Sequence, residues 1–280
     1  MADLSGFAAG YERNEQGWLL FPRDVKWRKE LFPQGVFDHP AKANLFLIQE
    51  LINYLTKPGD TILDPFGGTG TLLIGALSGR NIVLIEIEPG YLKLLEETQQ
   101  MWKEGVKLPT VGEVKGPGRI IIYEGDCRQR LQDMDFLCDA AIFSPPYANI
   151  LSSGGETRTG PSDRITSDVI QAYGGKEASS LNLGRLNPFY FEQAMNRVYE
   201  RLHARLVPGS RIAVISKDAM RMGKRLMLSE KIIRQAAKQK FELEEWHKWK
   251  MPMSSYRAPA TAKGFKTVED EDVLIFRRTS

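Results

Sequence analysis

Residues 61–78 read TILDPFGGTGTLLIGALS and join a short apolar run, a glycine-rich turn and a second apolar segment. The run 61–64 is typical of a strand, and the glycines after it let the backbone turn tightly and approach a ligand closely. The apolar residues that follow predict a helix over 70–78. A strand, a glycine turn and a helix in this order predict the first unit of a doubly wound α/β sheet, with a nucleotide-type site at the turn.

Apolar runs alternate with amphipathic stretches from residue 60 onward, which predicts a single Rossmann-like α/β domain with helices on both faces of a mostly parallel sheet. The β-branched residues in these runs are typical of strands buried on both faces. Strands are expected at 61–64, 81–88, 119–123, 140–143, 211–216 and 272–277. Helices are expected at 44–56, 70–78, 89–104, 188–206 and 226–239.

Two segments do not follow this alternation. Residues 1–36 form an N-terminal extension in which Trp18, Phe21, Trp27 and Phe32 stand among basic residues. Residues 148–187, within the main domain 37–280, are rich in Gly, Ser, Thr and Arg and predict a long loop. A loop of this length in a compact domain is usually functional or disordered, so 148–187 is a candidate nucleic-acid recognition insert.

Composition excludes several classes of protein. Of 280 residues, 42% are hydrophobic and 26% are charged, as in an ordinary globular protein, and no apolar run is long enough for a membrane helix. The N-terminus lacks the pattern of an export signal, so the cytoplasm is the expected compartment. Cys127 and Cys138 are too few for a disulfide framework, and neither they nor the three histidines form a metal-binding motif, so no metal is expected.

The net charge of +3 is too small to imply a polyanionic partner, but its distribution is uneven. Between Lys217 and Lys250 there are ten basic and five acidic residues, a local excess of +5. Such an excess favours contact with phosphate backbones. A solvated helix face explains it equally well, and both interpretations remain open.

The acid that ends the first strand indicates the kind of ligand. Asp64 would repel a pyrophosphate, whereas it would attract the ammonium group of a methionine moiety. Leu73 stands where a dinucleotide fingerprint requires Gly or Ala, and no GK[ST] sequence follows the loop, so two common phosphate-binding loops are excluded. A simple strand-to-helix turn is the alternative interpretation.

Two further acids end the next two strands. Glu86 lies about 20 residues after the loop, where a carboxylate can accept hydrogen bonds from both hydroxyls of a ribose. Asp126 follows the third strand and is placed to accept a hydrogen bond from an adenine amino group. Glu86 could instead face solvent, and Asp126 could instead cap a helix that begins near Arg128. Acids at three successive strand ends favour a binding site.

The strand at 140–143 leads directly into Ser144-Pro145-Pro146-Tyr147, the most specific motif in the chain. Two prolines remove two N–H donors and fix the backbone, which leaves carbonyl oxygens free to face a cleft. The Ser144 hydroxyl and the Pro145 carbonyl can accept the hydrogens of an exocyclic amine and make its nitrogen more nucleophilic. Tyr147 offers a ring on which a base can stack. A rigid turn is the alternative interpretation of the motif.

With these motifs, the sequence resembles the S-adenosylmethionine-dependent amino-methyltransferases of DNA, which form N4-methylcytosine or N6-methyladenine. The resemblance implies S-adenosylmethionine as the cofactor and Ser144, Pro145, Pro146 and Tyr147 as the catalytic residues. The segment from His39 to the helix ending near residue 55 is similar to the family's border of the methionine end of the cofactor. The implied cofactor-binding residues are His39, Lys42, Asp64, Phe66, Gly67, Gly68, Thr69, Gly70, Thr71, Glu86, Ile87, Asp126 and Cys127.

The resemblance also implies a seven-stranded sheet, with an antiparallel terminal strand and a final hairpin between 241 and 277. Serine at position 144 favours cytosine N4 over adenine N6, with direct in-line methyl transfer to a flipped-out base. The cofactor motif precedes the catalytic motif, and the large target-recognition domain of many family members is not evident. DNA contacts are therefore expected from Arg158, Arg164 and Arg185, from Lys217, Arg221, Lys224 and Arg225, or from the N-terminal extension.

Other functions compete with this one. RNA is the alternative nucleic-acid substrate, because related folds methylate RNA bases with similar tetrapeptides. A catalytically silent nucleic-acid-binding subunit is an alternative from another class. Methylation at cytosine C5 is disfavoured, because neither cysteine follows a proline. A homodimer and a restriction endonuclease partner, as in a restriction-modification system, remain open.

Overall fold

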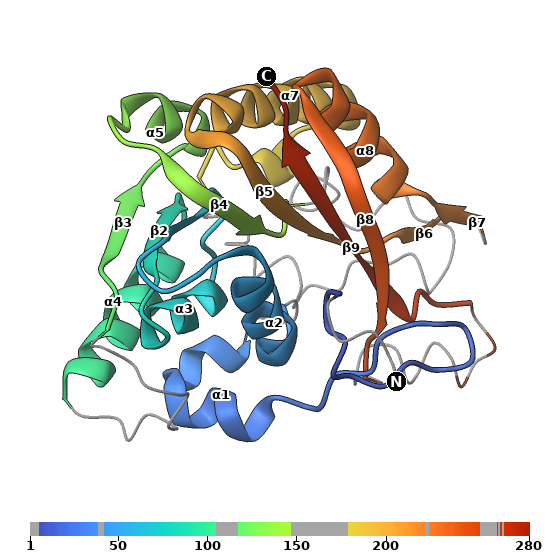
Figure 1. Ribbon diagram of the computed structural model, residues 1–280, viewed down its shortest axis with the longest axis horizontal. Helices are drawn as coiled ribbons and strands as arrows, with labels where there is room; N and C mark the ends of the chain where they lie inside the picture. Colours follow the sequence, from blue (N-terminus) through green and yellow to red (C-terminus); the bar gives the residue numbers. More distant parts are fainter. Residues whose placement is uncertain are drawn as a thin grey trace.

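The computed structural model describes residues 6–38, 42–104, 117–146, 179–221, 224–252, 262, 264 and 266–280. Its centre is a seven-stranded sheet in the order β3-β2-β1-β4-β5-β9-β8 (Figure 1). The first five strands in this order are parallel, and β9 is antiparallel to both of its neighbours. The predicted Rossmann-like α/β fold is therefore confirmed, with its final strand inserted antiparallel between β5 and β8.

The strands begin and end close to the expected positions. The sheet consists of β1 (Thr61–Asp64), β2 (Asn81–Glu86), β3 (Ile120–Glu124), β4 (Cys138–Phe143), β5 (Leu206–Ser216), β8 (Phe241–Lys250) and β9 (Asp270–Arg278). A separate two-stranded hairpin consists of β6 (Ala219–Arg221) and β7 (Lys224–Leu226). The expected hairpin between 241 and 277 is formed by β8 and β9. Strands β6 and β7 were not predicted from the sequence.

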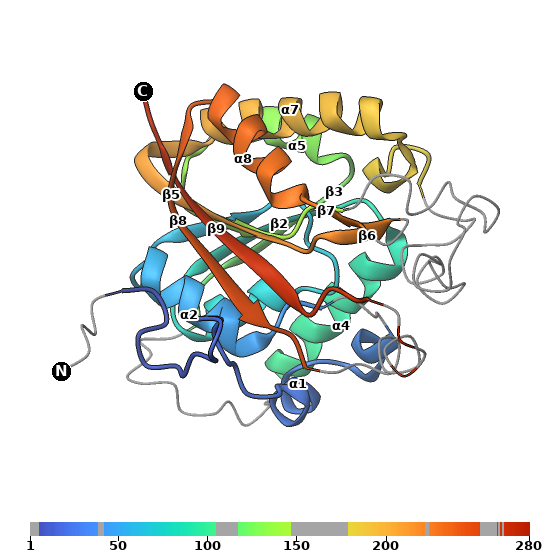
Figure 2. The same ribbon diagram turned by 90° about the vertical axis from the view of Figure 1, so that its right-hand side faces the viewer.

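Helices cover both faces of the sheet (Figure 2). One apolar cluster packs α1 (Val25–Leu31), α2 (Leu45–Leu55), α3 (Ile74–Leu77) and α4 (Pro89–Lys103) against one face. A second cluster packs α5 (Cys127–Asp133), α7 (Pro188–Ala204) and α8 (Leu228–Lys238) against the other. Within the described residues, no helix is both long and apolar enough to cross a bilayer.

The helix expected over 70–78 is only partly present. Thr71–Leu73 forms a 3-10 turn, and only Ile74–Leu77 is α-helical. Gly70 precedes this turn in the left-handed region, with φ of 80°, and Gly79, with φ of 76°, follows the Ser78 C-cap of the short helix. Two left-handed residues so close together leave room for only a short helix, because an α-helix requires negative φ throughout.

The N-terminal extension packs against the main domain. The Leu19 N–H donates to the Lys248 carbonyl, and the Lys250 N–H donates to the Leu19 carbonyl, so residue 19 lies beside the edge strand β8. Leu31 is fully buried, and its carbonyl accepts a hydrogen bond from Trp102 Nε1 on α4 at 2.7 Å. The described part of the extension therefore contributes to the same apolar core as α2 and α4.

Candidate functional site

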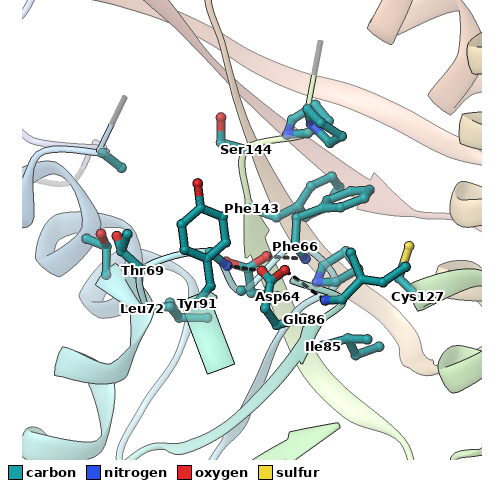
Figure 3. Close-up of a pocket in the computed structure, with 18 of the residues that line it drawn as sticks. Asp64, Phe66, Thr69, Leu72, Ile85, Glu86, Tyr91, Cys127, Phe143 and Ser144 are labelled. Carbon is teal, nitrogen blue, oxygen red and sulfur yellow. Dashed lines mark hydrogen bonds between the residues drawn. The ribbon is translucent and has the colours of Figure 1, made fainter. Parts of the chain in front are cut away.

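A pocket lies at the carboxyl edge of the parallel strands, where loops from β1, β2, β3 and β4 converge. It brings together residues that are distant in sequence, with the carboxylates of Asp64 and Glu86 below Phe66 and Phe143, and Ser144 above them (Figure 3). The predicted site residues that line it are Lys42, Asp64, Phe66, Gly67, Gly68, Thr69, Thr71, Glu86, Ile87, Asp126, Cys127, Ser144, Pro145 and Pro146. His39 and Tyr147 lie outside the described residues.

Asp64 is the last residue of β1, and its side chain is buried. Its Oδ1 accepts a hydrogen bond from the Phe66 N–H at 2.8 Å, and no cation pairs with it within the part of the chain that the structure describes. Burial, together with the charge of Glu86, raises the pKa of Asp64 to about 8. A buried carboxylate without a cationic partner is a suitable place for a positively charged ligand group.

Glu86 ends β2 and is held by backbone donors. Its Oε1 accepts from the N–H groups of Ile87 and Glu88, at 2.7 and 2.8 Å, and its Oε2 accepts from the Gly68 N–H at 2.5 Å. Burial nevertheless raises the pKa of Glu86 to about 7. The carboxylate therefore fixes the glycine loop to the end of β2, with one further acceptor position available for a ligand.

Gly67 and Gly70 of the loop have different roles. Gly67 passes close to β2, because its N–H donates to the Ile85 carbonyl at 2.9 Å and an added Cβ would lie 3.2 Å from the Leu84 Cβ. Gly70 does not line the pocket, and a Cβ there would lie 2.5 Å from Leu95 Cδ2 on α4. Gly70 is thus required by packing and by its positive φ rather than by contact with a ligand.

Asp126 is occupied by protein groups. It caps α5 by accepting from the Arg128 N–H at 2.8 Å, and its carboxylate forms a two-pronged ion pair with the Arg128 guanidinium. The capping alternative that the sequence left open is therefore observed, and adenine recognition by this carboxylate stays a prediction. Burial raises the pKa of the neighbouring Cys127 thiol, which leaves it neutral and unreactive.

Ser144 and the two prolines leave β4 directly into the pocket. Ser144 is exposed, whereas Pro145 is buried. Phe143, which precedes them, stacks at a tilt against Phe66 of the glycine loop, with ring centroids 6.0 Å apart. The tetrapeptide and the glycine loop are therefore two neighbouring walls of one pocket.

Arg28 is a supporting residue that the sequence did not reveal. It is buried, and its guanidinium donates to the Ala43 carbonyl at 2.6 Å and to Thr71 Oγ1 at 3.3 Å, while it pairs with Asp24. Lys42 Nζ, in the same region, donates to the Phe37 carbonyl at 3.1 Å. The N-terminal helix α1 therefore fixes both the segment before α2 and the turn after the glycine loop.

Several pocket residues were not predicted. Glu88 accepts from Asn182 Nδ2 at 2.5 Å and from the Ser179 N–H at 3.1 Å, which holds segment 179–183 against the pocket. Their contact could not be read from the sequence, because it joins positions more than 90 residues apart. The other unpredicted lining residues are Ala43, Ile48, Pro65, Leu72, Ile85, Tyr91, Gly125, Ile142, Phe143, Leu183, Ile215 and Glu271.

The residues predicted to contact nucleic acid lie in different environments. Arg225 donates to Asp218 at 2.7 Å and to both oxygens of Asp270 at 2.9 and 2.5 Å, which favours a structural role at the base of the β6–β7 hairpin. Arg185 donates to the Ser179 carbonyl at 3.1 Å. Lys224 is exposed on β7, and Lys217 follows β5. Arg221 lies in β6, and Arg158 and Arg164 lie outside the described residues.

The strand order and a pocket at the carboxyl edge define the class as a Rossmann-like methyltransferase fold. Comparison with known proteins agrees with this class. Residues 10–97 match a family model described as DNA methylase, which confirms the predicted resemblance over those residues and supports S-adenosylmethionine as the cofactor. The match includes Asp64 and Glu86 and ends before Ser144.

Curated relatives are similar over short stretches. The type II methyltransferase M.BglI of Bacillus subtilis is 53% identical over 58 residues, which are 20% of this chain and 17% of that protein. The type II methyltransferase M2.MboI of Moraxella bovis is 37% identical over 93 residues, 33% of this chain and 32% of that protein. The matched stretches thus span less than a third of either relative.

Among solved structures, a precorrin 8W decarboxylase from Methanobacterium thermoautotrophicum superimposes with a TM-score of 0.49 at 15% identity, covering 89% of this chain and 97% of that one.

Proposed function

We propose that this protein is an S-adenosylmethionine-dependent methyltransferase that modifies an exocyclic amino group of a DNA base. One observation carries the proposal: Ser144, Pro145 and Pro146 line the same pocket as Asp64 and Glu86. A cofactor site and an amine-binding motif that share one pocket can bring a methyl donor and an amine into contact.

The residues at the ends of β1 and β2 suit the cofactor. Asp64, buried without a cationic partner among the described residues, would hold the ammonium group of the methionine moiety. Glu86 would accept a ribose hydroxyl while it anchors the Gly68 N–H. S-adenosylmethionine supplies an activated methyl group on a positively charged sulfur. A cationic donor is favoured by the negative potential of two buried carboxylates.

The residues after β4 suit the amine. The Ser144 hydroxyl and the Pro145 carbonyl would accept the two hydrogens of the amino group, which directs the nitrogen lone pair toward the cofactor side of the pocket. Positioning of this kind supplies most of the catalysis, because in-line attack on a sulfonium methyl needs no strong base. A base in a duplex would first have to rotate out of the stack, at a cost of a few kcal/mol.

Cytosine N4 is our preferred target over adenine N6, on the basis of serine at position 144. DNA is our preferred substrate over RNA, in keeping with the family match over residues 10–97 and with two relatives named as type II methyltransferases. A cytoplasmic location fits this proposal, and a restriction endonuclease partner stays an open prediction. The exposed Lys224 and the adjoining basic stretch would contact the phosphate backbone.

The proposal is tested by mass spectrometry of nucleosides after incubation with methyl-labelled cofactor and, separately, unmethylated DNA and RNA. Labelled N4-methylcytosine in DNA is the expected product. Labelled N6-methyladenine would keep the enzyme class and overturn the preference based on Ser144. Label in RNA alone would show that RNA, and not DNA, is the substrate. Label in neither would favour a silent nucleic-acid-binding subunit.

Ser144→Ala provides the matched site variant. It should lower turnover about a hundredfold, the usual effect of removing one preorganised hydrogen-bonding group in an active site. Ser210→Ala is the control, because Ser210 lies in β5 outside the pocket and its Oγ has no hydrogen-bond partner in the described structure. Equal turnover in both variants would remove Ser144 from the mechanism.

A further inference from the structure

Glu271 is a pocket residue that the proposed roles do not use. It lies at the start of β9, where the antiparallel strand brings its amino end to the edge at which β4 and β5 end. The nearest pairs in this register are Ser216 with Asp272 and Ile215 with Val273, so Glu271 lies just beyond the end of β5. Ile215 lines the pocket beside it.

The strand order places Glu271 on the far side of Ser144 from the cofactor acids. Across the sheet, the ends of β3, β2 and β1 carry Asp126, Glu86 and Asp64, whereas Ser144 follows β4, and β5 and β9 come next. Neighbouring strands lie about 4.8 Å apart, so two spacings separate the backbones of β4 and β9 by roughly 10 Å. Ser144 and Glu271 therefore line the same pocket from strands that lie two positions apart in the sheet.

The Glu271 side chain is held in place from β8. Trp249 is paired with Glu271 in the β8–β9 register, and its Nε1 donates to Glu271 Oε2 at 3.0 Å. Trp249 is itself buried and lies beside Leu19 of the N-terminal extension. One carboxyl oxygen is therefore engaged by a rigid indole, and the carboxyl group lines the pocket, where a ligand can meet it.

Groups on β9, after β5 and on β8 shift the pKa of Glu271. Burial is the main cause that raises the pKa of Glu271, and Asp270 and Asp272 on its own strand raise it further. Lys217, after β5, lowers it, as does the hydrogen bond from Trp249 on β8. These causes together raise the pKa of Glu271, and a carboxyl whose pKa is raised by burial can keep its proton and donate a hydrogen bond.

We propose that Glu271 is a specificity-determining residue that donates a hydrogen bond to the ring nitrogen beside the amino group of the target base. This inference rests on the proposed function. In cytosine and in adenine, the ring nitrogen next to the amino-bearing carbon is an acceptor, whereas thymine, uracil and guanine carry an N–H at the corresponding position. A neutral Glu271 therefore matches cytosine and adenine. With thymine, uracil or guanine, its O–H would face the N–H of the base, so two donors would oppose each other.

The substitutions Glu271→Ala and Glu271→Gln separate the role of the donor from that of the side chain. Glu271→Ala should lower kcat/KM on DNA about tenfold or more, mainly through KM, because the base loses a buried hydrogen bond. Glu271→Gln keeps an N–H donor and should stay within a few-fold of the wild type. Glu269→Gln, which lies two positions earlier and outside the pocket, is the control and should behave as the wild type. Cofactor affinity should be the same in all four proteins.

Modified substrates test the contact directly. An oligonucleotide with 3-deazacytosine at the target has C–H in place of the ring nitrogen, and 1-deazaadenine is the equivalent if the target is adenine. The wild type and Glu271→Gln should discriminate against the deaza base about tenfold or more, whereas Glu271→Ala should treat both bases alike. Equal discrimination by wild type and Glu271→Ala would overturn the proposal.

The pH profile distinguishes a donor from a structural residue. The acid form of Glu271 is lost as pH rises through its pKa, so kcat/KM of the wild type at saturating cofactor should fall on the alkaline side. Glu271→Gln cannot ionise and should lack this fall. The same alkaline fall in Glu271→Gln would contradict the assignment. Absence of methyl transfer by the wild type to any nucleic acid would instead refute the proposed function.

Discussion

The two halves of the pocket are built in different ways. The half that we assign to the cofactor, at the ends of β1 and β2, uses residues close together in sequence, and its acids are fixed by backbone N–H groups such as those of Phe66 and Gly68. The half beyond Ser144 uses side chains from distant strands, such as Glu271 on β9 held by Trp249 on β8. Residues 10–97, which match the family model, include the first half and stop before the second.

This difference shows which part of the site can vary independently. We expect a half made of local backbone geometry to tolerate little change, because each group depends on a turn. A half made of side chains on rigid strands can change its ligand by single substitutions. We therefore expect the cofactor half to be sensitive to backbone changes and the other half to charge changes.

The largest effect on stability is expected at Arg225. Arg225→Ala would remove the ion-pair partner of Asp218, whose side chain is fully buried, and one of the two partners of Asp270. A buried charge left without its partner destabilises a protein by about 3 kcal/mol. Urea unfolding should show this loss. A change below about 0.5 kcal/mol would mean that Arg225 is free to serve another role, such as phosphate contact.

Gly70→Ala is expected to have the next largest effect. The alanine would have to adopt the φ of 80° and place its Cβ 2.5 Å from Leu95 Cδ2, so we expect a loss of about 2 kcal/mol in the free energy of unfolding. Gly90→Ala is the matched control, because Gly90 lies in α4 with open space around it and alanine favours the helix. Thermal unfolding should show a lower Tm for the first variant only. Equal Tm values would show that the loop conformation is not constrained.

Cofactor affinity should depend on pH. With pKa values of about 8 and about 7, Asp64 and Glu86 are partly protonated near neutral pH in the free pocket. A cationic ligand favours their ionised forms, so the protein must release protons to bind it, and affinity should rise as pH passes through about 7 to 8. Each pH unit below these pKa values should cost up to about tenfold per proton released.

Calorimetry in two buffers with different ionisation enthalpies measures this proton release. Asp64→Asn should remove most of the pH dependence, whereas Asp60→Asn, at the other end of β1 and outside the pocket, should keep it. Affinity that is independent of pH in the wild type would show that the two carboxylates do not face the charged groups of the cofactor.

The smallest effect is expected at Lys224. Its side chain is exposed on β7, so Lys224→Ala should leave stability unchanged within about 0.5 kcal/mol. If Lys224 contacts a phosphate, DNA affinity should fall modestly, and the slope of log K against log salt should decrease by about one. Fluorescence anisotropy over a range of salt concentrations measures the slope. An unchanged slope would indicate a solvated strand and not a DNA surface.

The sequence allowed prediction of most of the sheet, because buried parallel strands are continuous apolar runs, as in 81–86 and 140–143. It also allowed prediction of the glycine loop and of the acids at the strand ends. The helix predicted over 70–78 was wrong in detail, because the apolar pattern does not reveal the left-handed conformation of Gly70. The strand expected at 211 begins at Leu206, because Pro208 and Gly209 conceal its first part.

The remaining features depend on long-range contacts. Three hydrogen bonds join residues that only tertiary packing brings together: Glu88 with Asn182, Arg28 with Thr71, and Glu271 with Trp249. No local pattern marks them. Arg225 illustrates the reverse difficulty, because its basic character predicts a contact with DNA, whereas the structure pairs it with two buried acids. Charge in a sequence does not distinguish a surface residue from a buried ion pair.

We propose that one pocket has a cofactor half and an amine half. The most direct measurement compares Asp64→Asn with Ser144→Ala, for cofactor affinity by calorimetry and for single-turnover methyl transfer. We predict that Asp64→Asn loses about a hundredfold in cofactor affinity, as expected for a lost charge-assisted contact in a buried site. Ser144→Ala should keep the wild-type affinity for the cofactor and lose methyl transfer. Loss of cofactor affinity to the same extent in both variants would contradict the division of the pocket.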